Sequence, residues 1–144
     1  MSSLRLLAPP AHTWQLLSWK PTSGDDLRRV RAELRDFFAE NHLGDDVAQR
    51  IALVATELAG NALRHGVPPV VVRLLRDDDC YFLDVSDHDP EHAPQPASGM
   101  RNSHAGGRGL LIARSLADQL CWHRDELTKH VWASFPLPPA AASR

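Results

Sequence analysis

The chain has 144 residues, the size of one domain, with 43% hydrophobic and 24% charged residues, as in ordinary globular proteins. Its formal net charge of -2 offers no general attraction for nucleic acid or an anionic membrane, which excludes binding driven by a basic surface. No apolar stretch approaches the ~20 residues of a membrane-spanning helix, and two cysteines cannot build a disulfide framework, so we expect a cytoplasmic protein.

The first third of the chain predicts a strand followed by a helix. Residues 12–19 form a weak candidate strand, and residues 20–24 form a turn. From residue 26 to about residue 41, apolar side chains recur every three or four positions, which predicts an amphipathic helix. Ser23 or Asp25 could cap the start of this helix.

A second and more apolar helix is predicted to run to about His65. Asp45 or Asp46 could cap its start, and Gly66, followed closely by two prolines, would end it. Its predicted buried stripe is Val47, Ile51, Val54, Leu58 and Ala62.

The second half predicts four strands, one long loop and one helix. The strands are expected at residues 70–75, 80–86, 120–124 and 130–137. The first two form a hairpin. Residues 88–107 contain three prolines and three glycines without apolar periodicity, which is typical of a functional loop such as a lid. A third helix is marked by apolar residues from Leu110 to Leu120.

Helices that alternate with pairs of antiparallel strands favour an α+β fold over a doubly wound sheet. We expect a single domain over residues 12–138, in which one mixed, mostly antiparallel sheet is covered by three helices in a two-layer sandwich. Residues 1–11 and 139–144 are expected to be tails.

Glu57 and Asn61 are the most informative pair of residues. They lie one helical turn apart beside the buried stripe, where a carboxylate and an amide cost several kcal/mol unless something binds them. The Asn61 oxygen could complete the shell of a magnesium ion that bridges phosphates. Glu57 could accept a proton from an attacking hydroxyl or water. His65, one further turn along, could line the same site or only interact with the helix dipole.

Two more stretches suit a nucleotide. Asp87 ends an apolar strand, where it could accept a hydrogen bond from an exocyclic amine such as that of adenine. Gly106, Gly107 and Gly109 precede Leu110 at a helix start, where free N–H groups favour phosphate. Arg108, between these glycines, could add a charge-assisted contact. Each signal is weak alone, and the ordered combination is the specific one.

The segments Glu57-Leu58-x-x-Asn61-Ala62-x-x-His65-Gly66, Val85-Ser86-Asp87 and Gly107-Arg108-Gly109-Leu110 resemble the N, G1 and G2 boxes of the histidine-kinase-like ATPase superfamily, which includes gyrase B and MutL. The resemblance is strongest to the small anti-sigma factor serine/threonine kinases of the RsbW/SpoIIAB type, and it covers residues 14–138. It implies a Bergerat-type ATP-binding fold.

The resemblance also implies roles for these residues. Asn61 would bind Mg²⁺, Asp87 would contact the adenine amine, and the backbone from Gly106 to Leu110 would hold the phosphates of ATP. Glu57 would act as general base on a serine of a partner protein. The implied partners are a STAS-domain anti-anti-sigma factor and a sigma factor. A homodimer is also expected from the resemblance, although no stripe of residues supports it independently.

Three features depart from the family pattern. Asp87 is followed by His88-Asp89-Pro90-Glu91, where the family commonly has Asp-x-Gly-x-Gly. His130 stands where relatives typically carry a threonine near the nucleotide. Gly60 lies inside the second predicted helix at a cost of about 1 kcal/mol relative to alanine, which close approach of a nucleotide, a neighbouring helix or simple packing would explain.

Other functions compete with the kinase. The domain could bind a nucleotide and capture a sigma factor with little or no phosphoryl transfer. His88-Asp89-Pro90-Glu91-His92 also matches the inverted zinc-protease pattern, but that pattern needs a helix and Pro90 opposes one. A histidine kinase assembled in trans is disfavoured, because no upstream helix carries a phosphoacceptor pattern.

Overall fold

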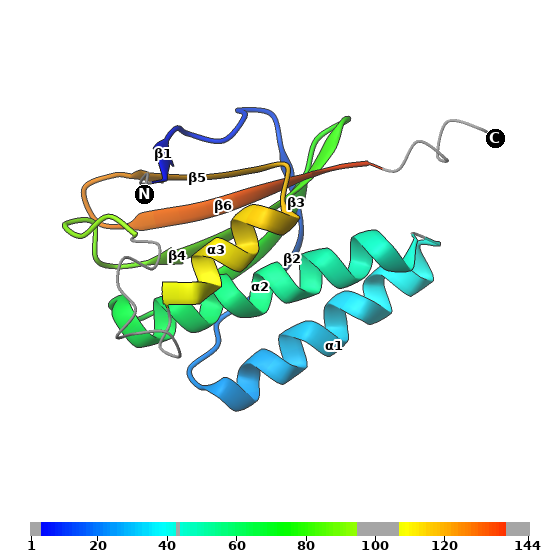
Figure 1. Ribbon diagram of the computed structural model, residues 1–144, viewed down its shortest axis with the longest axis horizontal. Coiled ribbons are helices and arrows are strands. Elements are labelled where there is room, and N and C mark those ends of the chain that lie inside the picture. The colour runs from blue at the N-terminus through cyan, green and yellow to red at the C-terminus, as the bar shows by residue number, and fades with distance from the viewer. Residues whose placement is uncertain (1–3, 43, 95–106, 138–144) are drawn as a thin grey trace.

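The computed structural model describes residues 4–42, 44–94 and 107–137, with only the backbone described for Gly107 and Arg108. Six strands form one sheet, and three helices lie together over one of its faces, which makes a two-layer sandwich (Figure 1). The predicted α+β class is therefore confirmed. In the described part of the chain, no helix is both long enough and apolar enough to cross a bilayer.

The elements follow one another in the predicted alternation of helices and strand pairs. In chain order they are β1 (Arg5–Leu6), β2 (Trp14–Trp19), α1 (Gly24–Glu40), α2 (Asp45–His65), β3 (Val71–Arg76), β4 (Cys80–Asp87), α3 (Gly107–Leu116), β5 (Gln119–Arg124) and β6 (Lys129–Pro136). The strand order is β1-β5-β6-β4-β3-β2. β1 pairs in parallel with β5 and every other pair is antiparallel, so the sheet is mixed and mostly antiparallel, as predicted.

Two helix boundaries differ from the prediction. Gly44 is the N-cap residue of α2, and Asp45 and Asp46 lie in its first turn, where the helix dipole favours carboxylates. α3 ends at Leu116 rather than at Leu120. Leu120 is a strand residue of β5 that packs into the same core, and this shared burial explains why it fitted the helical pattern.

The predicted N-terminal tail, residues 1–11, contains the edge strand β1. Two residues are too few to show a periodic pattern, so this strand could not be recognised in the sequence. The Leu7 N–H donates to the Trp122 carbonyl over 2.9 Å, and the Trp132 indole N–H donates to the Leu7 carbonyl over 2.8 Å. Residues 5–7 therefore lie on the sheet, joined to β5 and β6.

Strand alternation separates two faces of the sheet. Leu83 and Val85 of β4 belong to the main core under the helices, as do Val131 and Ala133 of β6. A smaller cluster on the other face contains Leu75, Phe82, Cys121 and Trp132. Because side chains alternate along a strand, Asp87 and Lys129 lie on the helix side, and Asp84 and His130 lie on the opposite side.

Candidate nucleotide site

The three predicted motifs meet at one end of the sandwich. In Figure 1, the C-terminal end of α2, the end of β4 and the start of α3 lie at the same side of the molecule. α2 contacts both β4 and α3, and it is thus the element that connects the other two. The geometry of each motif follows from these contacts.

Asp87 is the buried last residue of β4, and its carboxylate lies directly against Gly66. A β-carbon at Gly66 would clash with this carboxylate and would lie 2.8 Å from the Ala62 carbonyl oxygen. The backbone N–H of Asp89 donates to Oδ1 of Asp87 over 2.8 Å. Asp87 is therefore held beside the end of α2, little more than one turn from Asn61.

Lys129 is a second buried charge at this place, and the sequence analysis missed it. It is paired with Asp87 across β4 and β6, and its Nζ lies 3.7 Å from Oδ2 of Asp87. The same Nζ donates to the His92 carbonyl over 2.7 Å. Lys129 thus holds the chain at His92, a few residues after the end of β4. A signal was present, because Lys129 alternates with Val131 and Ala133 on the core-facing side of its strand.

His130 does not lie on the nucleotide side, where the family pattern placed a residue in contact with the nucleotide. Its ring points to the other face of the sheet and bonds Asp84. Side chains alternate along β6, so the position beside Asp87 belongs to Lys129.

Glu57 is half-buried on α2, and its carboxylate lies against the first turn of α3. A β-carbon at Gly109 would come within 2.7 Å of Oε1 of Glu57. The first N–H groups of a helix have no partner within the helix and carry partial positive charge, which favours an anion there. Within the described residues, the side chains of Glu57 and Asn61 have no hydrogen bond or ion pair with the protein.

The structure describes some of the other predicted site residues in full, some by their backbone only, and one not at all. His65 is the exposed last residue of α2. The side chain of Leu110 is buried in the main core, so only its backbone could reach a phosphate. Gly107 and Arg108 begin α3, and Gly106 lies outside the described residues.

Gly60 is buried inside α2, where it was noted as an unfavourable residue for a helix. The atoms nearest to a β-carbon placed there belong to the guanidinium of Arg64, with Nη1 at 3.3 Å. Its close neighbour is thus a side chain of its own helix.

The histidines of the zinc-protease pattern lie in an irregular segment. Residues 88–94 form no helix, as Pro90 predicted, and residues 95–106 of the expected loop lie outside the described part. The exposed His92 has its Nδ1 2.9 Å from Oδ2 of Asp89, and this hydrogen bond lowers the pKa of Asp89. The two histidines therefore lack the common helical face that a protease zinc site requires.

The groups at this end of the sandwich fit a nucleotide with magnesium. An amide oxygen suits Mg²⁺, which prefers oxygen ligands and usually shares them with phosphates. A helix start suits phosphate, and a buried carboxylate suits a donor such as an exocyclic amine. The Glu57 carboxylate and the Asn61 amide, which have no protein partner within the described residues, are available for such a ligand.

Comparisons with known proteins identify the family and the fold. The sequence model of the histidine kinase-like ATPase domain matches residues 21–135. A similar solved structure is that of the RsbU and RsbW domains of Rv1364c from Mycobacterium tuberculosis, with a TM-score of 0.61 and 19% sequence identity. The alignment covers 89% of this chain and 33% of that chain, so this chain spans a third of its length. At this identity the similarity shows a shared fold. The curated proteins gave no match.

Proposed function

Because the chain belongs to the histidine kinase-like ATPase domain family, we propose that it binds ATP with Mg²⁺ and phosphorylates a serine of a partner protein. The partner is a STAS-domain anti-anti-sigma factor, and the second client is a sigma factor that the protein sequesters to regulate transcription. One observation carries the proposal. Asp87, Asn61 and Glu57 come from motifs that meet at one end of the sandwich, each with a role that nucleotide chemistry needs.

Asp87 recognises the base in this proposal. Its carboxylate is held by the Asp89 N–H and by contact with Gly66, and a hydrogen bond from the adenine amine to a charged acceptor contributes about 1.5–3 kcal/mol. Lys129 lies near the same carboxylate and balances its charge, which lowers the cost of keeping it buried.

Asn61 and the start of α3 bind the other end of the nucleotide. The Asn61 amide oxygen is a ligand for Mg²⁺, and the N–H groups from Gly107 to Leu110 accommodate phosphate oxygens. From their positions in the sequence, Arg108 and His65 are proposed to add further contacts to the phosphates. Bound MgATP would supply the phosphoryl group that is transferred.

Glu57 acts as the general base. Its carboxylate lies at the same helix start that would accommodate phosphate, so a serine hydroxyl aimed at the phosphoryl group would come within its reach. Removing a proton from the attacking hydroxyl in this way contributes typically about 10²–10⁴-fold to a rate.

The partners rest on the resemblance of the three motifs to anti-sigma factor kinases. The solved neighbour whose name includes an RsbW domain has the same fold, which is consistent with this proposal. A homodimer is proposed on the same ground.

Thermal denaturation with and without nucleotide tests the binding site. At 100 times its Kd, ATP with Mg²⁺ should stabilise the protein by about 2.7 kcal/mol, or roughly 5–10 °C in Tm. Asp87→Asn should abolish most of the shift, and Asn61→Ala should remove its dependence on Mg²⁺. Asp78→Asn, in the exposed turn between β3 and β4, is the matched control and should keep the full shift. If no adenine nucleotide raises the Tm, ATP binding is wrong.

Incubation with labelled ATP and a STAS-domain protein tests the transfer. Wild-type protein should label a serine of the partner, and Glu57→Gln should slow the labelling about 10²–10⁴-fold while the ATP-induced Tm shift is kept. Glu40→Gln, an exposed carboxylate at the end of α1, is the control. If the wild type binds ATP but does not label the partner, the kinase proposal is wrong. The protein would then be a nucleotide-binding module that only captures its partner.

A further inference from the structure

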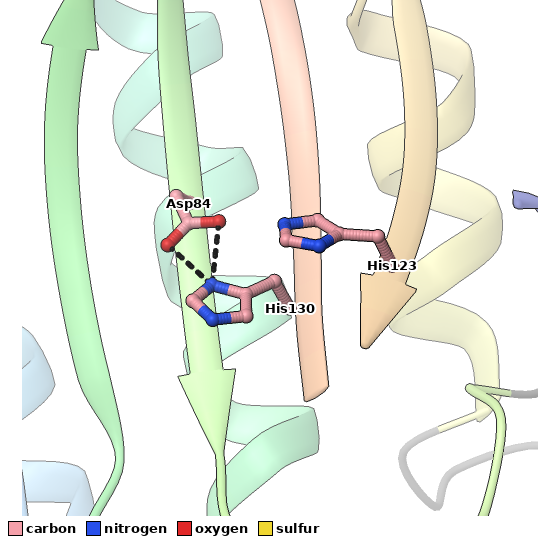
Figure 2. Close-up of side chains that lie close together, drawn as sticks. All are labelled: Asp84, His123 and His130. Atoms are coloured by element: carbon pink, nitrogen blue, oxygen red, sulfur yellow. Dashed lines mark hydrogen bonds and ion pairs between the residues drawn. The ribbon is translucent and has the colours of Figure 1, made fainter. Parts of the chain in front are cut away.

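The face of the sheet opposite the helices carries a second cluster of ligand-type side chains. Asp84 of β4, His123 of β5 and His130 of β6 each place one carboxylate oxygen or ring nitrogen within 4.8 Å of the others. Figure 2 shows the two imidazoles extending from neighbouring strands toward the carboxylate. Asp84 is only 2% exposed and the histidines are half-buried, so these are not loose surface groups.

A cavity of about 310 Å³ lies over this cluster. Pro9 and Thr13, which precede β2, and Gln15 of β2 line it together with the three clustered residues and Trp132. One water molecule takes roughly 30 Å³ in the liquid, so the cavity has room for an ion with several waters.

We propose that Asp84, His123 and His130 bind a divalent transition metal such as Zn²⁺. Imidazole and carboxylate are ligands that zinc takes in proteins, and three protein ligands leave a fourth position for water from the cavity. This site is separate from the proposed magnesium site, because it lies on the other face of the sheet and offers mainly nitrogen ligands, which Mg²⁺ disfavours. It does not depend on ATP binding.

His130 and Asp84 are already close to the required separation. Nδ1 of His130 lies 3.0 Å from Oδ2 and 3.1 Å from Oδ1 of Asp84. Two ligand atoms in a tetrahedral zinc site lie about 3.3 Å apart, since each is about 2.0 Å from the ion. The hydroxyl of Thr128 lies 3.2 Å from Nε2 of His130, and as the acceptor of that N–H it would leave the Nδ1 lone pair for a metal.

His123 supplies the third ligand. Its ring stacks on that of His130, with centroids 4.7 Å apart and planes inclined by 12°. Burial, and then the nearby His130, lowers the pKa of His123, a direction that favours the neutral imidazole over the charged one. Its side chain makes no hydrogen bond within the described residues, and it can therefore turn toward an ion without breaking one.

Among the described residues that line the cavity, Arg73 is the one Lys or Arg side chain, and its charge opposes a cation. Its Nη2 donates to Oδ2 of Asp84 over 3.0 Å. This leaves Oδ1 for a metal, and a ligating carboxylate commonly has such an outer hydrogen-bond partner. The positive charge reduces the affinity for a dication, so we expect moderate rather than tight binding.

Calorimetric titration of the full chain with Zn²⁺ near neutral pH tests the site, with Co²⁺ as a spectroscopic probe. Wild-type protein should bind one Zn²⁺ per chain, excess Mg²⁺ should not compete, and Co²⁺ should give the visible bands of a four-coordinate site. His123→Ala should weaken binding about 100-fold, since loss of even an outer partner costs about 10–100-fold. His42→Asn, an exposed histidine in the turn after α1, should bind as the wild type does.

His123→Gln is the second variant and should weaken zinc binding as His123→Ala does. It keeps most of the volume of the side chain. If circular dichroism shows that His123→Ala is unfolded, His123→Gln is the variant that tests whether His123 binds zinc. Wild-type zinc binding weaker than a Kd of about 1 mM would overturn the proposal. Equal affinity in the wild type and the folded His123 variant would also overturn it, because zinc would then be bound elsewhere.

Discussion

At Gly66, the carboxylate of Asp87 fills the space that a β-carbon would need. The backbone there has a negative φ, so what requires glycine is this close contact and not an unusual backbone conformation. Gly109 differs, since its nearest neighbour is the end of the flexible Glu57 side chain, which can move away. Of these two glycines, Gly66 is the one that fixes the position of a site residue.

Gly66→Ala is expected to push Asp87 out of place. Overpacking of this kind costs about 1–3 kcal/mol, and the displaced carboxylate should weaken ATP binding at least about tenfold. Isothermal titration with ATP and Mg²⁺ measures the change.

The control for this substitution is Gly24→Ala at the start of α1. A β-carbon there has nothing within 4 Å, so ATP affinity should stay unchanged. Unchanged affinity in Gly66→Ala would show that Asp87 does not contact the base.

At the level of elements, β4 and β6 serve both faces of the sheet. Asp87 and Lys129 are register partners on the helix side, and one step along each strand the opposite face carries Ser86 and His130, which are also partners. Because the side-chain period of a strand is two residues, neighbouring positions build separate sites on opposite faces.

The turn between β5 and β6 depends on Asp125. Its Oδ1 accepts hydrogen bonds from the N–H groups of Leu127 and Thr128 and from the Thr128 hydroxyl, at 2.8–2.9 Å. These bonds, the Leu127 N–H first, lower the pKa of Asp125 from 3.8 to about 2. A lowered folded-state pKa stabilises the protein above pH 3.8, and this contribution is lost as the pH falls toward 2.

Asp125→Asn should therefore flatten the dependence of stability on pH between about pH 4 and pH 2. It should also lower stability at neutral pH, because the charged acceptor of the turn is gone. Urea midpoints measured across this range test the effect, with the exposed Glu126→Gln in the same turn as control. A slope as steep as that of the wild type would show that other carboxylates carry the acid sensitivity.

At the scale of the whole molecule, one core joins the helices to the sheet. Phe38 of α1 has no exposed surface, and its ring lies edge-on to Tyr81 of β4 with centroids 5.3 Å apart. It thus connects the helix layer to a central strand.

Phe38→Ala should lower the free energy of unfolding by about 3–5 kcal/mol, because it leaves a cavity in this core. Leu127→Ala, whose side chain is 70% exposed, should change it by less than about 0.5 kcal/mol. Urea unfolding followed by circular dichroism measures both. A loss of about 1 kcal/mol or less in Phe38→Ala would mean that α1 contributes little to the common core.

Much of the architecture could be predicted because apolar periodicity is a local property. α2 extends to His65 as expected, and β3 and β4 form the expected hairpin. The prediction was wrong where an element was too short to show a period, as in β1, or where two elements shared a core, as at Leu120. The roles of Glu57, Asn61 and Asp87 stay predictions.

By itself the sequence determined the fold class, the order of every element except β1, and the positions of the three predicted motifs along the chain, because these depend on residue types and spacings within short stretches. Only the tertiary structure decided that Asp87 packs on Gly66, that Lys129 lies beside it, and that Asp84 meets two histidines. Such contacts join residues from different elements. They depend on the order and register of the strands, which local periodicity does not encode.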